Sequence, residues 1–546
     1  MKRILLILII LLAGVLRFYK LGEYPALNAD EAAIGYNAYS LILTGKDEHG
    51  NSWPIHFQSF NDYKPGLYFY LVLPLVKFLG LSEWAVRIPN AILGVLTVFL
   101  VYLFCKELFP KRKFGIWNLE VGIIASFMLA ISPLHIHFSR GGWEVDVSTF
   151  FILLGVFLFL KGRKNLTVLM FSVLSFVFAM YSYHAARVIV PLLGVGMLVI
   201  YRDEMRKNFK NYTLATLVGL VAILPLVKEL TKTEAISRAA GVGLFSDPGP
   251  VNRVNEQRGE HSYFDDIKVK ILHNKPVNYG LTFLENWIEH YDGEFLFLSG
   301  DDIQRNKTPE TGQLYLFQLP LLLTGFWFIF KKPGRWTFIL WWLIVGPIAS
   351  AFTFQSPHAL RAHNMVIPLT IISAYGLLKT KDLILMIFKN RIIKYSVFSV
   401  MFLVIFWELT RYLHMYYVHM TKEYPFSSQY GVKELVDYLE TTDRKFSKVV
   451  VTDRYDQPYI LFLFYLKYPP QKFQDGHVLT ERDRFGFSTV RQFDRYVFTS
   501  IQPWDKIRDD FRDSLIAGTN EEVPVANIVK KIYGSNGYLY FEVVAN

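Results

Sequence analysis

Apolar stretches recur along this chain, and they constrain its fold more than any other feature. Many are about 17–20 residues long, enough for a helix to cross a hydrocarbon layer of roughly 30 Å. Hydrophobic residues make up 52% of the 546 residues and charged residues only 19%. A soluble protein of this size would carry a more charged surface. The sequence therefore predicts a polytopic α-helical membrane protein.

Eleven segments are expected to span the membrane. Three larger pieces are expected outside it: the loop 19–85, the loop 231–313 and the tail 409–546. The chain is thus expected to divide into a membrane domain, 1–408, and a soluble domain, 409–546. The expected spans are residues 4–18, 86–105, 119–138, 146–160, 166–182, 187–201, 212–230, 314–330, 336–352, 363–378 and 392–408.

Basic residues set the orientation of these spans. If the apolar segment 67–80 does not cross the membrane, the connections on the side of the N-terminus hold 21 lysines and arginines. The short connections on the opposite side hold only Arg140 and Arg361. Positive charge marks the cytoplasmic side. The sequence therefore predicts a plasma-membrane protein with a cytoplasmic N-terminus, an extracytoplasmic tail, and 67–80 as a helix at the outer interface.

The net charge of +11 is explained by this topology. The basic residues lie between apolar spans and not on one soluble face, so nucleic acid is not an expected partner. Cys105 is the single cysteine, which excludes an intrachain disulfide and a thiolate metal cluster. The start of the chain also resembles a signal peptide, but the many later spans favour an uncleaved first span.

The tail has the composition of a small α/β domain. Residues 430–439 show the pattern of an amphipathic helix, and 458–466 fit a helix or a strand. Three further segments, 448–452, 496–498 and 538–544, are expected to be strands.

Two adjacent carboxylates, Asp30 and Glu31, lie just outside the first span. Acidic side chains at that place indicate chemistry on a lipid-linked substrate, with one carboxylate taking a proton. The alternative is that they cap a helix running from residue 32 to 43. Both roles can coexist.

Basic side chains recur at the outer span ends, where they could converge on a lipid phosphate. The alternative is that each one anchors its span at the headgroups. His184 and His358 each precede an arginine by three residues, so they would share its helix face if the segment is helical. The candidate phosphate and substrate ligands are Lys64, Arg87, Arg140, Tyr183, His184, Arg187, His358 and Arg361.

Two further acids, Glu144 and Asp146, are secondary candidates, although Asp146 could instead cap the span that follows it. His135 and His137 lie near a span end and are expected to be packed rather than metal-binding. No metal ligand set is therefore assigned, and no cofactor is implied.

Several short stretches together resemble one family of membrane enzymes. They are Asp30-Glu31 with Tyr36, Gly45-Lys46-Asp47-Glu48-His49-Gly50, Asp62-Tyr63-Lys64-Pro65-Gly66-Leu67-Tyr68, Ser82-Glu83-Trp84-Ala85-Val86-Arg87-Ile88-Pro89, and Ser132-Pro133 with Ser139-Arg140. In this order they resemble the GT-C membrane glycosyltransferases, specifically the dolichyl-phosphate-mannose protein mannosyltransferases and their bacterial relatives, including the aminoarabinose transferase of lipid A. The resemblance covers about residues 1–380.

The resemblance implies an inverting transfer from a polyprenyl-phosphate sugar. It places the catalytic carboxylate at Asp30, completes the acidic pair with Glu31, and places a lysine of the site at Lys64. A second acid of the bacterial relatives would fall near Asp146, where the spacing around Gly141-Gly142-Trp143 departs from the family pattern.

The expected function is therefore transfer of a sugar to a lipid, glycan or protein acceptor outside the cytoplasm. The donor phosphate is a good leaving group, so arginine and lysine can stabilise its charge without a metal. A flippase or transporter is an alternative, but such proteins keep ionisable residues at mid-span, and most spans here are uncharged. A glycan polymerase remains open. The expected partners are the donor, membrane lipids and an unidentified acceptor.

Overall fold

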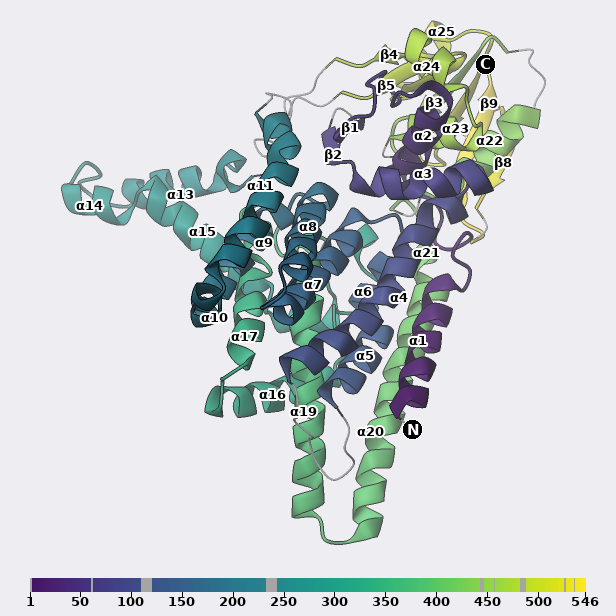
Figure 1. Cartoon of the computed structure of the whole chain (residues 1–546). Helices are drawn as coiled ribbons and strands as arrows, with labels where there is room; N and C mark the ends of the chain where they lie inside the picture. The colour runs from purple at the N-terminus through teal and green to yellow at the C-terminus, as the bar shows by residue number, and fades with distance from the viewer. Residues whose placement is uncertain are drawn as a thin grey trace. The chain divides into compact units, whose positions relative to one another are not determined.

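The computed structural model describes residues 2–59, 62–109, 120–231, 243–427, 429–441, 446–455, 457–481, 488–524, 527–534 and 536–546 (Figure 1). The chain is mostly helical, with a sheet domain in its tail. It forms two compact units. The first, called here the helical unit, contains Met1–Arg17, Ile92–Ser139 and Glu144–Leu413. The second, called the loop–tail unit, contains Phe18–Ala91, Arg140–Trp143 and His414–Asn546.

Helices lie over all eleven segments that were expected to span the membrane. They are α1 (Lys2–Phe18), α4 (Glu83–Leu108), α5 (Val121–Ile131), α6 (Pro133–Ser139), α7 (Glu144–Gly162), α8 (Leu166–Ser182), α9 (Ala186–Ile200), α11 (Phe209–Leu230), α16 (Gln318–Lys331), α17 (Trp336–Val345), α18 (Ile348–Ala351), α19 (Val366–Ile387) and α20 (Arg391–His414). A short helix, α10 (Arg202–Lys207), joins α9 to α11.

Four helices of the described residues are long and apolar enough to cross a membrane by themselves. They are Glu83–Leu108, Glu144–Gly162, Phe209–Leu230 and Arg391–Glu423. The bent pair α5 and α6, with an angle of 61° between its halves, makes a fifth. The chain is therefore an integral membrane protein, while the number of eleven spans stays a prediction.

Small residues let the helices of the helical unit approach closely. A Cβ on Gly376 of α19 would lie 1.8 Å from the carbonyl oxygen of Leu321 in α16. A Cβ on Gly155 of α7 would lie 2.7 Å from the ring of Phe176 in α8. Only glycine fits at such crossings, as is typical of helix packing in membranes.

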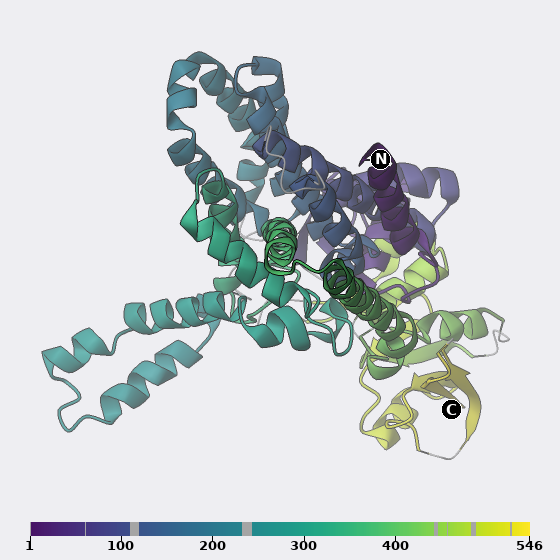
Figure 2. The same cartoon turned by 90° about the horizontal axis from the view of Figure 1, so that it is seen from below.

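The expected outer loop 231–313 is largely helical where it is described; its residues 232–242 lie outside the described part. Two of its helices, α13 and α15, pack against each other as a hairpin (Figure 2). The elements are η1 (Leu244–Ser246), α13 (Gly249–Gly259), α14 (Ile267–Leu272), α15 (Lys275–Glu289), η2 (Glu294–Leu298) and η3 (Gln304–Asn306).

The loop 19–85 folds into three elements of the loop–tail unit. A helix, α2 (Ala29–Thr44), packs against α3 (Leu67–Leu79), and a hairpin of β1 (His56–Ser59) and β2 (Asp62–Pro65) leads into α3. The helix expected at 67–80 is thus present, and its place at the membrane surface stays a prediction.

A seven-stranded mixed sheet forms the centre of the tail, in the order β4-β5-β6-β3-β7-β9-β8. Its middle strand, β3, runs parallel to β6 and β7. The strands are β3 (Lys448–Thr452), β4 (Val478–Leu479), β5 (Val490–Phe493), β6 (Tyr496–Thr499), β7 (Ser514–Gly518), β8 (Ile528–Tyr533) and β9 (Leu539–Ala545). The tail helices are α21 (Met420–Glu423), α22 (Val432–Thr441), α23 (Pro458–Tyr465), α24 (Pro470–Gly476) and α25 (Trp504–Asp510).

The expected α/β character of the tail is confirmed. The expected helix and the three expected strands correspond to α22, β3, β6 and β9, and the ambiguous segment 458–466 is the helix α23. This helix is apolar on all sides, because it packs against α2 through Phe464 while its other side is also covered. Residues 18–91 and the tail therefore share one compact unit, so the units do not follow the single boundary expected at 408.

Candidate active site

The acidic pair lies in the first turn of α2, in the loop–tail unit. The helix begins at Ala29, earlier than expected, and Asn28 is its N-cap. The Asn28 side chain accepts a hydrogen bond from the Glu31 amide, and the Glu31 carboxylate accepts one from the Asn28 amide. This reciprocal capping box replaces the expected capping role of Asp30. Asp30 and Glu31 thus lie at the positive end of the helix dipole.

Glu31 is buried, with 1% of its surface exposed, and its carboxylate is fully engaged. Arg87 donates from Nε to Oε1 at 2.7 Å and from Nη2 to Oε2 at 2.7 Å. The amide of Gly142 donates to Oε1 at 2.8 Å. These charge-assisted bonds tie the start of α2 to α4 and to the segment 140–143.

Arg87 uses all five of its N–H donors on protein oxygens. Besides Glu31, it donates to the carbonyls of Leu21, Pro25 and Ala26. A phosphate would have to displace one of these bonds. Arg87 thus holds Glu31 and the loop that precedes α2, and its role as a phosphate ligand stays a prediction.

The segment 140–143 approaches Glu31 closely because it contains two glycines. A Cβ on Gly142 would lie 3.1 Å from the Cγ atom of Glu31. Asn90 fixes the segment from α4 by donating to the carbonyls of Gly141 and Trp143. Arg140 is brought into the same unit by this segment.

Asp30 differs from its neighbour because its side chain remains 23% exposed. Its carboxylate forms an ion pair with the ammonium of Lys64, which lies on β2 opposite Phe57. Lys64 is itself 7% exposed. The hairpin thus places a cation beside the carboxylate at the start of α2, and the role of both residues in one site stays a prediction.

Glu48 is a buried acid near this pair that the sequence reasoning did not select. It is fully buried, and burial together with the negative charge of Asp47 raises its pKa to about 8. The charge of Lys64 partly opposes this increase. A raised pKa favours the neutral form of Glu48, whereas the carboxylate of Asp30 forms an ion pair with Lys64.

Arg140 is packed among tyrosines. Its guanidinium lies 5.4 Å from the ring centroid of Tyr416 and 5.3 Å from that of Tyr417. It also donates to the hydroxyl of Tyr416 and the carbonyl of Tyr24. Because it is fully buried, these cation–π contacts are substantial.

The secondary acids belong to the helical unit. Glu144 is the first residue of α7, so Asp146 lies inside the first turn and is not the expected cap. Asp146 is fully buried, and its Oδ1 lies 3.5 Å from Nε2 of His135 and 3.8 Å from Nε2 of His363. His135 also accepts a hydrogen bond from Arg17, at 2.7 Å. His137 bonds the carbonyl of Arg305.

The candidates around α9 also lie in the helical unit. Arg187 contacts Nδ1 of His184 at 2.9 Å, so these two side chains do meet. His184 precedes the helix, which begins at Ala186, and Tyr183 ends α8.

His358 and Arg361 lie in a turn before α19, so the expected helix face is absent there. His358 faces the buried carboxylate of Asp301, with 3.5 Å between Nδ1 and Oδ2. Arg361 instead donates to the Thr353 hydroxyl at 2.6 Å and to Gln355. The two side chains therefore have different partners.

No group of three or more His, Cys, Asp or Glu side chains in the described residues is arranged to hold a metal ion. Asp30, Glu31, Lys64, Arg87 and Arg140 are brought into one unit, and the other seven candidates lie in the other.

Known proteins resemble the chain in sequence and in fold. Residues 63–228 match the family model described as dolichyl-phosphate-mannose-protein mannosyltransferase. The structure resembles ArnT from Cupriavidus metallidurans bound to undecaprenyl phosphate, with a TM-score of 0.53 and 11% identity over 99% of this chain and 97% of ArnT. The chain therefore has the same fold as ArnT.

A second structural neighbour is the oligosaccharyltransferase of Archaeoglobus fulgidus, tethered to an acceptor peptide. The TM-score is 0.51 and the identity 13%, over 99% of this chain and 74% of that one. No curated protein matches the sequence. The resemblance to GT-C enzymes read from the sequence is thus confirmed. The family match begins after Asp30 and Glu31 and includes Lys64.

Proposed function

We propose that this GT-C protein is an inverting glycosyltransferase that moves a sugar from a polyprenyl-phosphate donor to an acceptor outside the cytoplasm. The observation that carries the proposal is the ion pair of Asp30 and Lys64 at the head of α2. A base for the acceptor and a cation for the donor phosphate are the groups that such a transfer needs. The undecaprenyl phosphate bound by ArnT supports this donor class.

In the proposed reaction, Asp30 accepts the proton of the acceptor hydroxyl. The oxygen of that hydroxyl forms a bond to the anomeric carbon, and the bond from this carbon to the phosphate oxygen breaks. The electron pair of the broken bond stays on the prenyl phosphate. Attack opposite the leaving group inverts the configuration at the anomeric carbon.

Lys64 has two successive partners in this scheme. Without substrate it pairs with Asp30, and its charge makes that carboxylate a weaker base. When the donor phosphate binds, the ammonium turns to it, and its ion pair with Asp30 breaks. The base therefore becomes stronger only when the donor is in place.

Glu31 and Arg87 act as positioning residues in this proposal. Glu31 is buried and accepts bonds from Arg87, Gly142 and Asn28. Their pairing fixes the first turn of α2, and with it the direction of Asp30.

The remaining candidates stay predictions from the sequence. Six of them are predicted ligands of a phosphate or a sugar, and two are predicted secondary acids. The six are Arg140, Tyr183, His184, Arg187, His358 and Arg361, and the acids are Glu144 and Asp146. The proposed topology has eleven spans in the plasma membrane, a cytoplasmic N-terminus and an extracytoplasmic tail.

The test uses the purified full-length protein in nanodiscs with a set of polyprenyl-phosphate sugars. Release of free prenyl phosphate, measured by mass spectrometry, is the expected result. Asp30→Asn keeps the size of the side chain and should reduce this release by at least about 10²-fold, in line with the loss of a general base. Asp203→Asn, at an exposed position on α10, is the matched control and should leave the release unchanged.

Both variants must unfold at the temperature of the parent. If Asp30→Asn then still releases prenyl phosphate like the parent, Asp30 is not the base. Movement of the lipid across the bilayer without release of prenyl phosphate would instead identify a flippase.

A further inference from the structure

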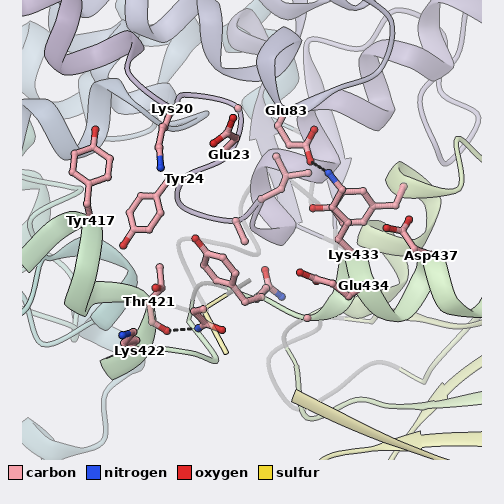
Figure 3. Close-up of a pocket in the computed structure, with 18 of the residues that line it drawn as sticks. Lys20, Glu23, Tyr24, Glu83, Tyr417, Thr421, Lys422, Lys433, Glu434 and Asp437 are labelled. Atoms are coloured by element: carbon pink, nitrogen blue, oxygen red, sulfur yellow. Dashed lines mark hydrogen bonds and ion pairs between the residues drawn. The ribbon is translucent and has the colours of Figure 1, made fainter. Parts of the chain in front are cut away.

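A large pocket opens beside the start of α2, within the loop–tail unit (Figure 3). Its volume is about 750 Å³. Pockets for small ligands are commonly about 300–1,000 Å³, so this one has room for one or two sugar rings. One wall is the loop that leads into α2, and the other is formed by α22 and the chain before it.

The pocket adjoins the proposed catalytic residues through shared elements. Arg87, which holds Glu31, also holds the loop wall through the carbonyls of Leu21, Pro25 and Ala26. Gln429 lines the pocket and accepts a hydrogen bond from the amide of Ala29, the residue before Asp30. The same backbone therefore forms the pocket wall and carries Asp30.

The pocket walls combine aromatic rings with carboxylates. Tyr24 and Tyr417 line one side, with Thr421 beside them, and Glu434 and Asp437 point in from α22 (Figure 3). Tyrosine offers an apolar face with a polar end, which suits the C–H faces and hydroxyls of a sugar ring. Ionised carboxylates only accept hydrogen bonds, so they favour a ligand rich in O–H or N–H donors.

The charges of the pocket argue against an anionic ligand. The lining contains Glu23, Glu83, Glu434 and Asp437 against three lysines. One of these lysines, Lys433, is already paired with Glu83 at 3.0 Å. Three carboxylates then remain against two lysines, so the lining keeps a net negative charge, which disfavours a phosphate.

The carboxylates on α22 point to the pocket for a reason visible in the sequence. Leu435, Val436 and Leu439 form the buried face of this helix. Glu434 and Asp437 are three residues apart, so they lie together on another face. The amphipathic pattern of α22 thus places acceptor groups along the pocket wall.

We propose that this pocket binds an uncharged, hydroxyl-rich carbohydrate and that this carbohydrate is the acceptor of the transfer. The assignment of this carbohydrate as the acceptor rests on the proposed function. Binding of the carbohydrate to the pocket can be measured independently of that function. In this arrangement the donor phosphate lies with Lys64, and the acceptor approaches from the side of the tail.

The first test measures binding to the full-length protein in detergent without any donor. The probes are the methyl glycosides of glucose, galactose and mannose, and glucose 6-phosphate is the anionic comparison. Binding of each probe is measured by saturation-transfer NMR. At least one neutral glycoside should bind more tightly than glucose 6-phosphate. The double variant Glu434→Gln/Asp437→Asn should weaken that binding at least about tenfold, the loss expected when two charged hydrogen-bond acceptors are removed.

The matched control is Glu440→Gln, a carboxylate of α22 that does not line the pocket. It should bind like the parent, and both α22 variants should unfold at the temperature of the parent. Tyr417→Ala is a second pocket variant, on the opposite wall, and should also weaken binding. No binding of any neutral glycoside, equal binding in the pocket variants, or tighter binding of glucose 6-phosphate would overturn the proposal.

The second measurement separates the two proposals. Neutral glycoside added to the prenyl-phosphate release assay should increase the release in the parent and in Glu440→Gln. If the sugar binds the pocket but does not increase release, the acceptor assignment fails while the site remains. If release depends on Asp30 and no sugar binds the pocket, the transferase stands and the pocket proposal fails.

Discussion

Asp30 and Glu31 are adjacent and chemically alike, yet their surroundings give them different tasks. Glu31 is enclosed and bonded to a buried arginine, whereas Asp30 keeps contact with solvent and pairs with Lys64. The sequence predicted that the pair matters and that Lys64 belongs with it. It could not separate the two roles, because Arg87 and Gly142 reach Glu31 from distant parts of the chain.

A first prediction follows from the buried pair of Glu31 and Arg87. Glu31→Gln leaves a buried guanidinium without its carboxylate, and breaking such a pair costs about 3–5 kcal/mol. Thermal unfolding in detergent should show a clear loss of stability, in contrast to Asp30→Asn. Glu204→Gln is the matched control: its partner is the partly exposed Arg163, and such pairs contribute at most about 1 kcal/mol. Equal melting temperatures for Glu31→Gln and its control would contradict this assignment.

A second prediction concerns pH. Burial raises the pKa of Glu48 to about 8, from the ordinary value of 4.5 for an exposed glutamate. Between these values the unfolded chain loses the proton of Glu48 and the folded protein keeps it. The contribution of this group to stability is therefore complete at acidic pH and declines as the pH rises towards 8, by about 1.4 kcal/mol per pH unit at most.

The measurement compares the unfolding temperature of the parent and of Glu48→Gln at pH 5 and pH 8. The parent should lose more stability between the two values than the variant, because glutamine does not titrate. Glu440→Gln, at an exposed position, should behave like the parent. An identical pH dependence in Glu48→Gln would show that Glu48 is ionised in the folded protein.

At the scale of the element, α2 carries the site because its first turn is fixed from several sides. The pattern Asn28-x-x-Glu31 is a capping box that can be read from the sequence. Reading it would have moved the expected start of the helix from 32 to 29. The bond from Ala29 to Gln429 could not be found in this way, since it joins parts of the chain without a local pattern.

A third prediction concerns this cap. Asn28→Ala removes the side chain that accepts from the Glu31 amide and should cost about 1 kcal/mol of stability. It should also reduce sugar transfer, because Asp30 lies in the turn that the cap fixes. Asn165→Ala removes the equivalent cap of α8, through the Val168 amide, and is the control. Asn165→Ala should lose a similar amount of stability and should keep its sugar transfer. If both variants lose transfer equally, the cap has no special link to the site.

At the scale of the whole molecule, the sequence predicted the helices, whereas the grouping of residues 18–91 with the tail has no local signal. Apolar length and turn residues are local signals, so all eleven segments are helical as expected. The association of residues 18–91 with the tail depends on contacts such as Phe464 against Gly35. Contacts between such distant residues leave no periodic pattern in either segment.

A fourth prediction tests the proposed topology. Cys105 is the single cysteine and is buried, so Cys105→Ala gives a background without reactive thiols. Cysteines are then placed singly at Trp53 and Tyr533, which are exposed in the loop–tail unit, and at Lys164, which is exposed between α7 and α8. A membrane-impermeant maleimide added to intact cells should label the first two and not the third. Labelling of Lys164→Cys in intact cells, or protection of Trp53→Cys from labelling, would show that the protein has the opposite topology.

The composition of the loop–tail unit has a consequence for biosynthesis. Its first part, residues 18–91, leaves the ribosome long before the tail that completes it, and nearly all of the helical unit is made in between. Contacts between segments so far apart in the sequence form late in folding. An incomplete translation product would then contain Asp30 and Lys64 without Gln429 and α23 behind them. On the proposed function, transfer activity should therefore arise only after the tail has been synthesised.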